Sequence, residues 1–231
     1  MARSVRLDTL RRQARELADM EDSSSVGFVD DTELDGMINT SLGIWHGMVV
    51  RAVPERYEAT DTISANGATS YALPADHLAT LGVEYQSSSS EYIDLERVMF
   101  HDRNKYGQTT SSMALGYRLS GTAIVLIPAP SSGTYRHVYV TAADVLASDS
   151  DTIDGVNGWE SWIVYDCAVK MLQKEESDAS QVMKDRDRLW REIEAAAVDR
   201  ELANPKYVVD TRTKRWSYSL GYGQRDPDFW S

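Results

Sequence analysis

The sequence predicts an α+β protein, specifically a four-helix bundle interrupted by a β-strand-rich insertion and followed by an extended C-terminal tail. Apolar residues recur at helical spacing near both ends of the chain but alternate with period two in the middle. Beyond Pro205 no helical stripe continues, although aromatic residues are frequent. We expect residues 1–54 and 156–204 to form the bundle, 55–155 the inserted β domain with its linker, and 205–231 the extension.

Two helices are predicted before the β insertion. An apolar stripe from Leu7 to Leu17 recurs every three or four residues and predicts the first helix. The second is expected to start with Asp30 as its N-cap, since Glu33 stands three residues later in a pattern close to a capping box. Pro54 should end this helix, because proline lacks the N–H that a helix interior requires.

The middle of the chain is predicted to form a series of short strands. Asn66-Gly67 separates two runs of alternating apolar and polar residues and predicts a β-hairpin. Gly121 and the stretch 128–133 predict two further turns. The expected strands lie in RYEATDTI, TSYALP, LGVEYQ, YRLSG, TAIVLIP and YRHVYVTAA.

Helical spacing returns at Gly158 and predicts two more helices. The first of these is apolar on more than one face, which is typical of a helix in the middle of a bundle. The second is expected to end at Asn204-Pro205. Cys167, the single cysteine, lies among apolar residues and is interpreted as a small buried side chain, so no intramolecular disulfide is possible.

An acidic stretch precedes the third helix. Asp149 and Glu160 are spaced like the first and last ligands of a calcium-binding EF-hand loop, but Ile153 occupies a ligand position. We therefore expect a solvated linker in which Asp154 or Asn157 caps the next helix.

Charge and motifs exclude several function classes. The net charge of −12 and the pI of about 4.8 are opposite to the basic surface of a protein that grips nucleic acid. No apolar run approaches the roughly 20 residues that span a bilayer, so we expect a soluble protein made inside the cell. Nucleotide-binding loops, hydrolase motifs and metal-ligand spacings are missing from the sequence, and we expect no enzyme activity and no cofactor.

The C-terminal tail is chemically different from the acidic chain before it. Between Lys206 and Arg225 five basic residues stand against one acid, Asp210. Aromatic and basic side chains on a segment that cannot bury them itself indicate docking on a partner, although a strand packed on its own chain is an alternative. The candidate partner-binding residues are Tyr207, Arg212, Lys214, Arg215, Trp216, Tyr218, Tyr222 and Arg225.

Four passages give the chain a resemblance to the head-tail adaptor proteins of tailed bacteriophages, also called head completion or head-tail connector proteins. These passages are FVDDTELDGMINTSLGIWHGMV, SYALPADHLATLGVEYQ, GYRLSGTAIVLIPAPSSGTYRHVYV and GVNGWESWIVYDCAVKML. They resemble the family's capped second helix, its strand-proline-aspartate-strand passage, its later hairpin and its return to the helices. The resemblance extends over nearly the whole chain.

The resemblance implies a structural protein of the virion, assembled in the host cytoplasm and placed at the head-tail interface. It implies a ring of twelve copies around a channel through which genomic DNA passes without specific binding. The expected partners are the portal protein, reached by the C-terminal tail, a downstream tail or neck protein, and further copies of the chain, with no membrane involved. The alternatives are another neck protein, a tail-completion or tail-terminator protein, and a nucleic-acid-binding accessory protein that uses the basic aromatic tail.

Overall fold

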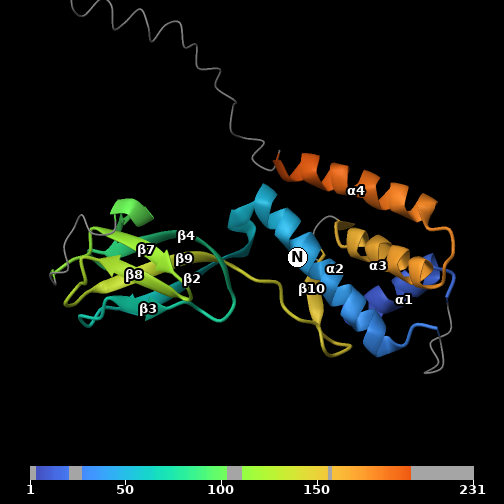
Figure 1. Cartoon of the computed structure of the whole chain (residues 1–231), viewed down its shortest axis with the longest axis horizontal. Coiled ribbons are helices and arrows are strands. Elements are labelled where there is room, and N and C mark those ends of the chain that lie inside the picture. The colour runs from blue at the N-terminus through green and yellow to red at the C-terminus, as the bar shows by residue number, and fades with distance from the viewer. Residues whose placement is uncertain (1–3, 21–27, 103–110, 156–157, 199–231) are drawn as a thin grey trace, which may run out of the picture. The chain divides into compact units, whose positions relative to one another are not determined.

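Four helices and ten strands are seen in the part of the chain that the computed structural model describes, which is residues 4–20, 28–102, 111–155 and 158–198. Along the chain, the helices come near both ends of this part and most of the strands come between them. Figure 1 shows the four helices gathered on one side and most of the strands on the other. The helix bounds are α1 Leu7–Leu17, α2 Asp31–Ala52, α3 Ser161–Lys174 and α4 Ser180–Val198.

Helix α2 has the ends that its sequence predicts. The Asp30 carboxylate accepts a hydrogen bond from the Glu33 backbone N–H at 2.7 Å, which confirms the predicted cap. The helix stops at Ala52, and Pro54 opens the short 3-10 helix η1, Pro54–Tyr57. The face of α2 that includes Leu34 and Trp45 is buried in the hydrophobic core shared with the other helices.

Helix α3 is central to the helical part. Eight of its residues are buried, and α1, α2 and α4 each pack against it (Figure 1). Cys167 is among these buried residues, which confirms its interpretation as a core side chain. The core cluster joins residues that precede the strands, such as Leu34, to residues that follow them, such as Ile163 and Ile193.

The α+β assignment is correct, but the predicted four-helix bundle is wrong. A four-helix bundle has four helices around one shared axis. Here α1, α2 and α4 surround α3, and no substantial contact joins α1 to α4 within the described residues. The physical reason is that α3 is apolar on several faces and can take three neighbours, while α1 has only 11 residues.

Two four-stranded sheets make up most of the strand-rich part. The first sheet has the order β2 (Glu58–Ser64), β9 (Thr134–Thr141), β4 (His77–Gln86), β5 (Tyr92–Asp94). The second has the order β3 (Ser70–Ala72), β8 (Ala123–Ile127), β7 (Gly116–Ser120), β6 (Glu96–Arg97). A second hydrophobic cluster contains residues of both sheets, including Val83 and Tyr135 from the first and Ile124 and Leu126 from the second.

The turns in this part do not all do what their sequences predict. The predicted hairpin at Asn66-Gly67 is wrong, because β2 pairs with β9 while β3 pairs with β8. Gly67 has a φ of 88°, so the residue makes a turn, but the turn carries the chain from one sheet to the other. At Gly121, whose φ is 60°, the predicted turn is confirmed, since it joins the paired strands β7 and β8.

The acidic linker also differs from its prediction. Thr152–Asp154 forms strand β10, which pairs antiparallel with β1 (Ser4–Arg6) beside the helices. Asp154 does not cap α3, because the N-cap position is Glu160, and the Asp154 carboxylate forms an ion pair with Arg56 instead. The alternative cap, Asn157, lies outside the described residues.

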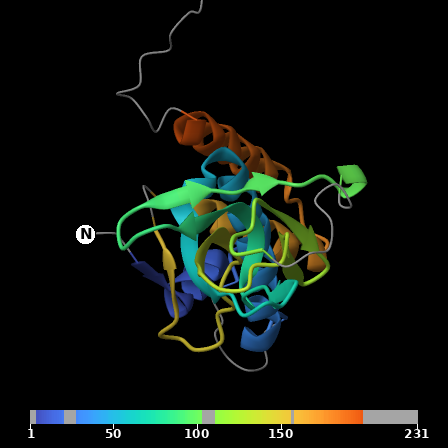
Figure 2. The same cartoon turned by 90° about the vertical axis from the view of Figure 1, so that its left-hand side faces the viewer.

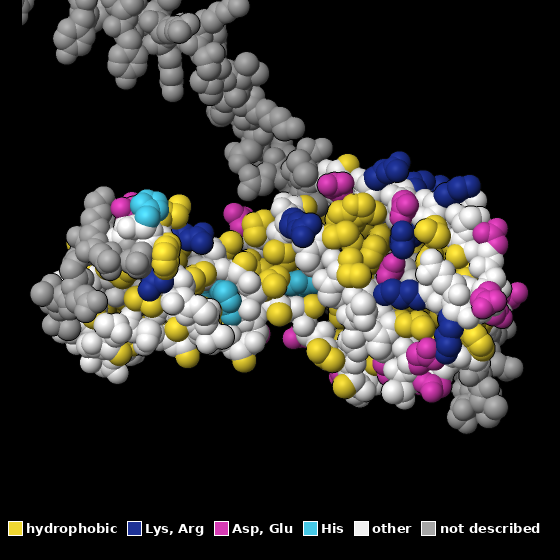
Figure 3. All heavy atoms as spheres, in the orientation of Figure 1, with side chains coloured by type: hydrophobic (Ala, Val, Ile, Leu, Met, Phe, Trp, Pro, Cys, Tyr) yellow, Lys and Arg dark blue, Asp and Glu magenta, His cyan; other side chains and the backbone are white. Residues whose placement is uncertain are grey.

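The described residues up to Val198 form one compact unit. In this unit no helix has the length and apolar character needed to span a membrane. Charged side chains are most frequent over the helices, as Figure 3 shows for one face.

Candidate interaction surfaces

The residues predicted to bind a partner lie outside the described part of the chain. They are Tyr207, Arg212, Lys214, Arg215, Trp216, Tyr218, Tyr222 and Arg225, all beyond Val198. Their role therefore stays a prediction, and the described residues supply the other surfaces and polar clusters below.

A buried polar cluster that sequence reasoning missed joins α2, α3 and α4. Lys170 donates to the Ser41 hydroxyl at 2.7 Å and lies 2.9 Å from the Asp166 carboxylate. The same carboxylate lies 2.8 Å from the Ser41 hydroxyl and 3.0 Å from the Arg186 guanidinium. Asp166 thus holds side chains of two other helices as well as Lys170 on its own helix.

This cluster has groups that some enzymes use, but its surroundings do not suit catalysis. Ser41 is fully buried, and the amine near it is ion-paired with a carboxylate. Burial alone would raise the pKa of Asp166, but hydrogen bonds from Lys170 and Ser41 reverse the effect and lower it. Burial raises the pKa of the neighbouring Cys167 thiol to about 11, so this thiol stays protonated at neutral pH. The cluster is a structural clamp.

The signal that could have revealed the clamp is the placement of polar residues on apolar faces. Ser41 follows the helical spacing of the buried side of α2, and Asp166 and Lys170 are four residues apart within an apolar stretch. Buried charges are seldom unpaired, so this pattern predicts an ion pair there. The contribution of Arg186 has no comparable local signal.

Ion pairs also connect the N-terminal helix to the rest of the helical part. Arg11 makes two hydrogen bonds to Asp35, one of them 2.7 Å long, and a third bond of 2.6 Å to Asp149. The bond to Asp35 is the main cause of a raised pKa for Arg11. Arg15 pairs with Asp31 at 2.6 Å. The arginines of α1 therefore hold the helix in place, and Asp149 acts as an ion-pair partner.

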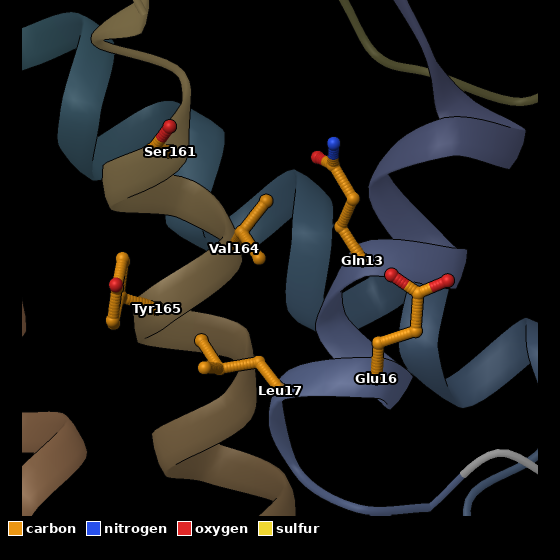
Figure 4. Close-up of a pocket in the computed structure, with 6 residues that line it drawn as sticks. All are labelled: Gln13, Glu16, Leu17, Ser161, Val164 and Tyr165. Carbon is orange, nitrogen blue, oxygen red and sulfur yellow. The ribbon is translucent and has the colours of Figure 1, made fainter.

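A groove of about 390 Å³ lies between α1 and α3 (Figure 4). Leu17 and Val164 supply its apolar wall, and Gln13 and Glu16 from α1 carry the polar groups at its border. Tyr165 and Ser161 complete the lining on the α3 side. A groove of this size and mixed polarity suits a side chain of a partner protein.

Large apolar side chains are exposed where the two sheets end. Five of them occur between residues 92 and 115, in or beside the edge strands β5 and β6 and the 3-10 helix η2, Phe100–Asp102. They are Tyr92, Ile93, Met99, Phe100 and Leu115. Figure 2 shows η2 standing away from the sheets. Exposed apolar groups at an open sheet edge are a common feature of protein contact surfaces.

Two histidines lie close together on the first sheet. Both His77 Nε2 and His137 Nε2 are within 3.0 Å of the Thr80 hydroxyl, and the His137 ring stacks on Tyr139. Burial, together with the nearby His77, lowers the pKa of His137 to about 4. His137 is therefore neutral at physiological pH. The described residues contain no group of three side chains placed to hold a metal ion.

The family model described as SU10 adaptor protein matches residues 5–217 of the chain. The chain belongs to this family. The family is one of phage head-tail adaptors, so the resemblance seen in the sequence is confirmed, and this adaptor has the general role of a structural virion protein. A search of curated proteins returns no match.

Membership in the family gives the surfaces of this adaptor a common interpretation. An adaptor of the head-tail interface associates with portal and tail proteins and forms oligomers. The groove between α1 and α3 and the apolar sheet edge are accordingly candidates for contacts between protein chains, whereas the clamp around Asp166 and the ion pairs of Arg11 and Arg15 stabilise the subunit itself.

Proposed function

We propose that this adaptor forms a ring, of twelve copies, between the portal and the tail, and that the ring surrounds the channel through which DNA leaves the head. The observation that carries the proposal is the family match over residues 5–217. In the ring we assign the helical segments within 1–54 and 156–204 to the body, and strands β2 to β9 of the inserted region 55–155 to a projection from it.

The charge of the chain supports a role as a channel wall. DNA binding is driven largely by cations that displace counterions from phosphates, and each such contact would slow a passing duplex. A chain with a net charge of −12 makes few of these contacts. The duplex therefore slides past the ring without specific binding.

We propose further that residues 205–231 are the portal-docking extension. The segment combines aromatic anchors with flanking cations, which is the composition of energetically important residues in protein interfaces. Trp216, Tyr218 and Tyr222 are the central anchors. Lys214, Arg215 and Arg225 would pair with acidic portal residues while their aliphatic stems pack beside the rings, and Tyr207 and Arg212 extend the contact.

We propose that the protein has no catalytic activity. The only serine and lysine of the described residues found in a catalytic-like arrangement, Ser41 and Lys170, belong to the buried clamp. The Ser41→Ala variant should therefore be less stable than the unchanged chain, and neither protein should show turnover. Any hydrolytic activity of the purified protein that disappears in this variant would contradict the proposal.

The test of the docking extension is co-sedimentation with purified portal rings at moderate salt. We compare the full chain with a chain truncated after Asn204, with the double variant Trp216→Ala and Tyr218→Ala, and with the matched double variant Phe229→Ala and Trp230→Ala. Truncation and the first double variant should abolish binding, while the matched variant should bind like the full chain. Circular dichroism should show equal helix content in all of them.

Two results would overturn the assignment. If the truncated chain binds portal as well as the full chain, the contact lies elsewhere on the subunit. If both double variants lose binding equally, the segment acts through general apolar contact, and the named anchors are wrong.

A further inference from the structure

A small cavity lies where helix α2, the 3-10 helix η1, strand β10 and the segment that leaves β9 meet. Its volume is about 130 Å³. Trp45 and His46 line it from α2, Tyr57 from η1 and Asp154 from β10, and residues 141–144 complete the wall. The cavity is separate from the groove between α1 and α3.

Buried polar atoms without protein partners gather around this cavity. Trp45 and His46 are only 2% and 5% exposed, yet Trp45 Nε1 and His46 Nε2 make no hydrogen bond within the protein. Asp154 Oδ1 also has no partner, although the other oxygen of this carboxylate pairs with Arg56. A buried polar group that lacks a partner is costly, and several at one place indicate a molecule that binds them.

These groups require a ligand that can both donate and accept hydrogen bonds. The indole N–H of Trp45 only donates, and the Asp154 carboxylate only accepts. Burial lowers the pKa of His46, so its ring is neutral at pH 7 and can donate or accept according to its tautomer. An apolar ligand would leave all three groups unsatisfied.

The charges around the cavity do not favour an ionic ligand over an uncharged one. Asp154 is already neutralised by Arg56, so an added cation would compete with the guanidinium. An anion would lie between Asp154 and Asp144, which also lines the wall. The described residues hold no group of three metal-binding side chains, here or elsewhere.

We propose that this cavity binds a small uncharged molecule that bridges Trp45, His46 and Asp154 by hydrogen bonds. Water is the smallest such molecule, and the volume holds roughly four waters or one compact neutral solute such as acetamide. The bound molecule links α2 to β10 and so fixes the place where the chain passes between helices and strands. The proposal is independent of the ring and of portal binding.

The test follows the indole N–H signal of Trp45 in the ¹⁵N-labelled full chain, assigned with the Trp45→Phe variant. Acetamide and acetate have the same shape but differ in charge, and they serve as the two probes. Acetamide should shift the Trp45 signal in a saturable manner, whereas acetate should have no effect. The signal of Trp162, a buried residue of α3 that does not line the cavity, should stay in place. Without a probe, the Trp45 indole proton should show cross-relaxation with a long-lived water molecule.

The two sources of ligand are distinguished by the pattern of results. Water cross-relaxation without any acetamide shift assigns the site to water, and a saturable acetamide shift shows that neutral solutes enter. If neither signal is seen, or if acetate acts like acetamide, the proposal is wrong.

A variant that fills the cavity provides the matched control. Ala143 lines the cavity, so Ala143→Leu should abolish both the water and the acetamide responses. An unchanged Trp162 signal shows that the Ala143→Leu variant is folded. If that variant does not fold, Ala142→Leu is used in its place. A folded filled variant that keeps the acetamide response would show that acetamide binds somewhere else.

Discussion

The helical part and the strand-rich part of this adaptor are built in opposite ways. The helices come from both sides of the strands, and their contacts join residues far apart in the chain, such as Ser41 and Asp166, which are 125 positions apart. Strands β2 to β9 come from one continuous stretch and enclose their own hydrophobic cluster. Ion pairs likewise concentrate among the helices, whereas Glu84–Arg136 is the pair that joins strands within the described residues.

The difference indicates that the two parts depend on different forces. The strand-rich part is stabilised by sheet hydrogen bonds and by apolar residues such as Ile124 and Tyr135, all of which belong to one continuous stretch of the chain. In the helical part, α2 and α3 must meet across the whole strand-rich stretch, so the chain first has to bring distant segments together. Buried polar contacts then fix which helix faces meet.

The largest effect is expected when the two parts are separated. Residues 55–143 alone should fold, because they contain β2 to β9 and their cluster, and they should unfold cooperatively in urea with strand-type circular dichroism. Residues 1–54 alone should have little stable helix, since α1 and α2 lose α3. If fragment 55–143 shows no cooperative transition, the strand-rich part does not fold from its own contacts alone.

The second effect concerns the clamp. Asp166→Ala leaves Lys170 and Arg186 without their buried carboxylate and should lower the free energy of unfolding by about 4 kcal/mol. The matched change in the strand-rich part, Glu84→Gln, removes the partly exposed partner of Arg136 and should cost below about 1 kcal/mol. Urea denaturation of both variants measures the difference, and equal losses would show that polar contacts matter equally in the two parts.

The third effect is the pH dependence that His137 gives to the strand-rich part. The folded state holds the pKa of His137 at about 4, below its ordinary value of 6.5, so the unfolded chain takes up the proton first. Stability is therefore full above pH 6.5 and falls as the pH drops toward 4, by up to about 3 kcal/mol. His137→Phe should flatten this slope in fragment 55–143, while the exposed His101→Gln should not. A slope that His137→Phe leaves unchanged would assign the dependence to other groups.

The smallest effect is local to α2. Asp30→Ala removes the cap that accepts the Glu33 N–H and should cost about 1 kcal/mol of stability. Asp30→Asn keeps an oxygen acceptor and should cost much less. Thermal unfolding of the full chain distinguishes the two, and equal losses would mean that the charge at this position matters more than the hydrogen bond.

The sequence could predict features that depend on neighbouring residues, but not those that depend on residues far apart in the chain. The ends of α2 were predictable because Asp30 and Pro54 act on neighbouring backbone atoms, and Cys167 was predictable because its neighbours are apolar. Strand pairing was not, since the Asn66-Gly67 turn is a local feature whereas the partner of β2 is decided by β9, some 70 residues later. The family was recognisable because its passages cover nearly the whole chain.

The helix arrangement and the contacts that the polar cluster makes between helices could not be predicted locally, for the same reason. Helical periodicity shows that α3 has several apolar faces but does not show which helices cover them. The prediction of a four-helix bundle was wrong for this reason. Strand β10 was interpreted as a linker because three residues carry too weak a pattern. The Ser41 contact with Asp166 depends on packing between distant helices, which one sequence does not reveal.

The most direct test of the proposed assembly is the mass of the complex that the full chain forms with purified portal rings, measured by native mass spectrometry. We expect twelve copies of the adaptor on each portal ring, and portal rings without adaptor when the chain is truncated after Asn204. A full chain that stays monomeric in the presence of portal, or that binds in another copy number, would contradict the proposed ring.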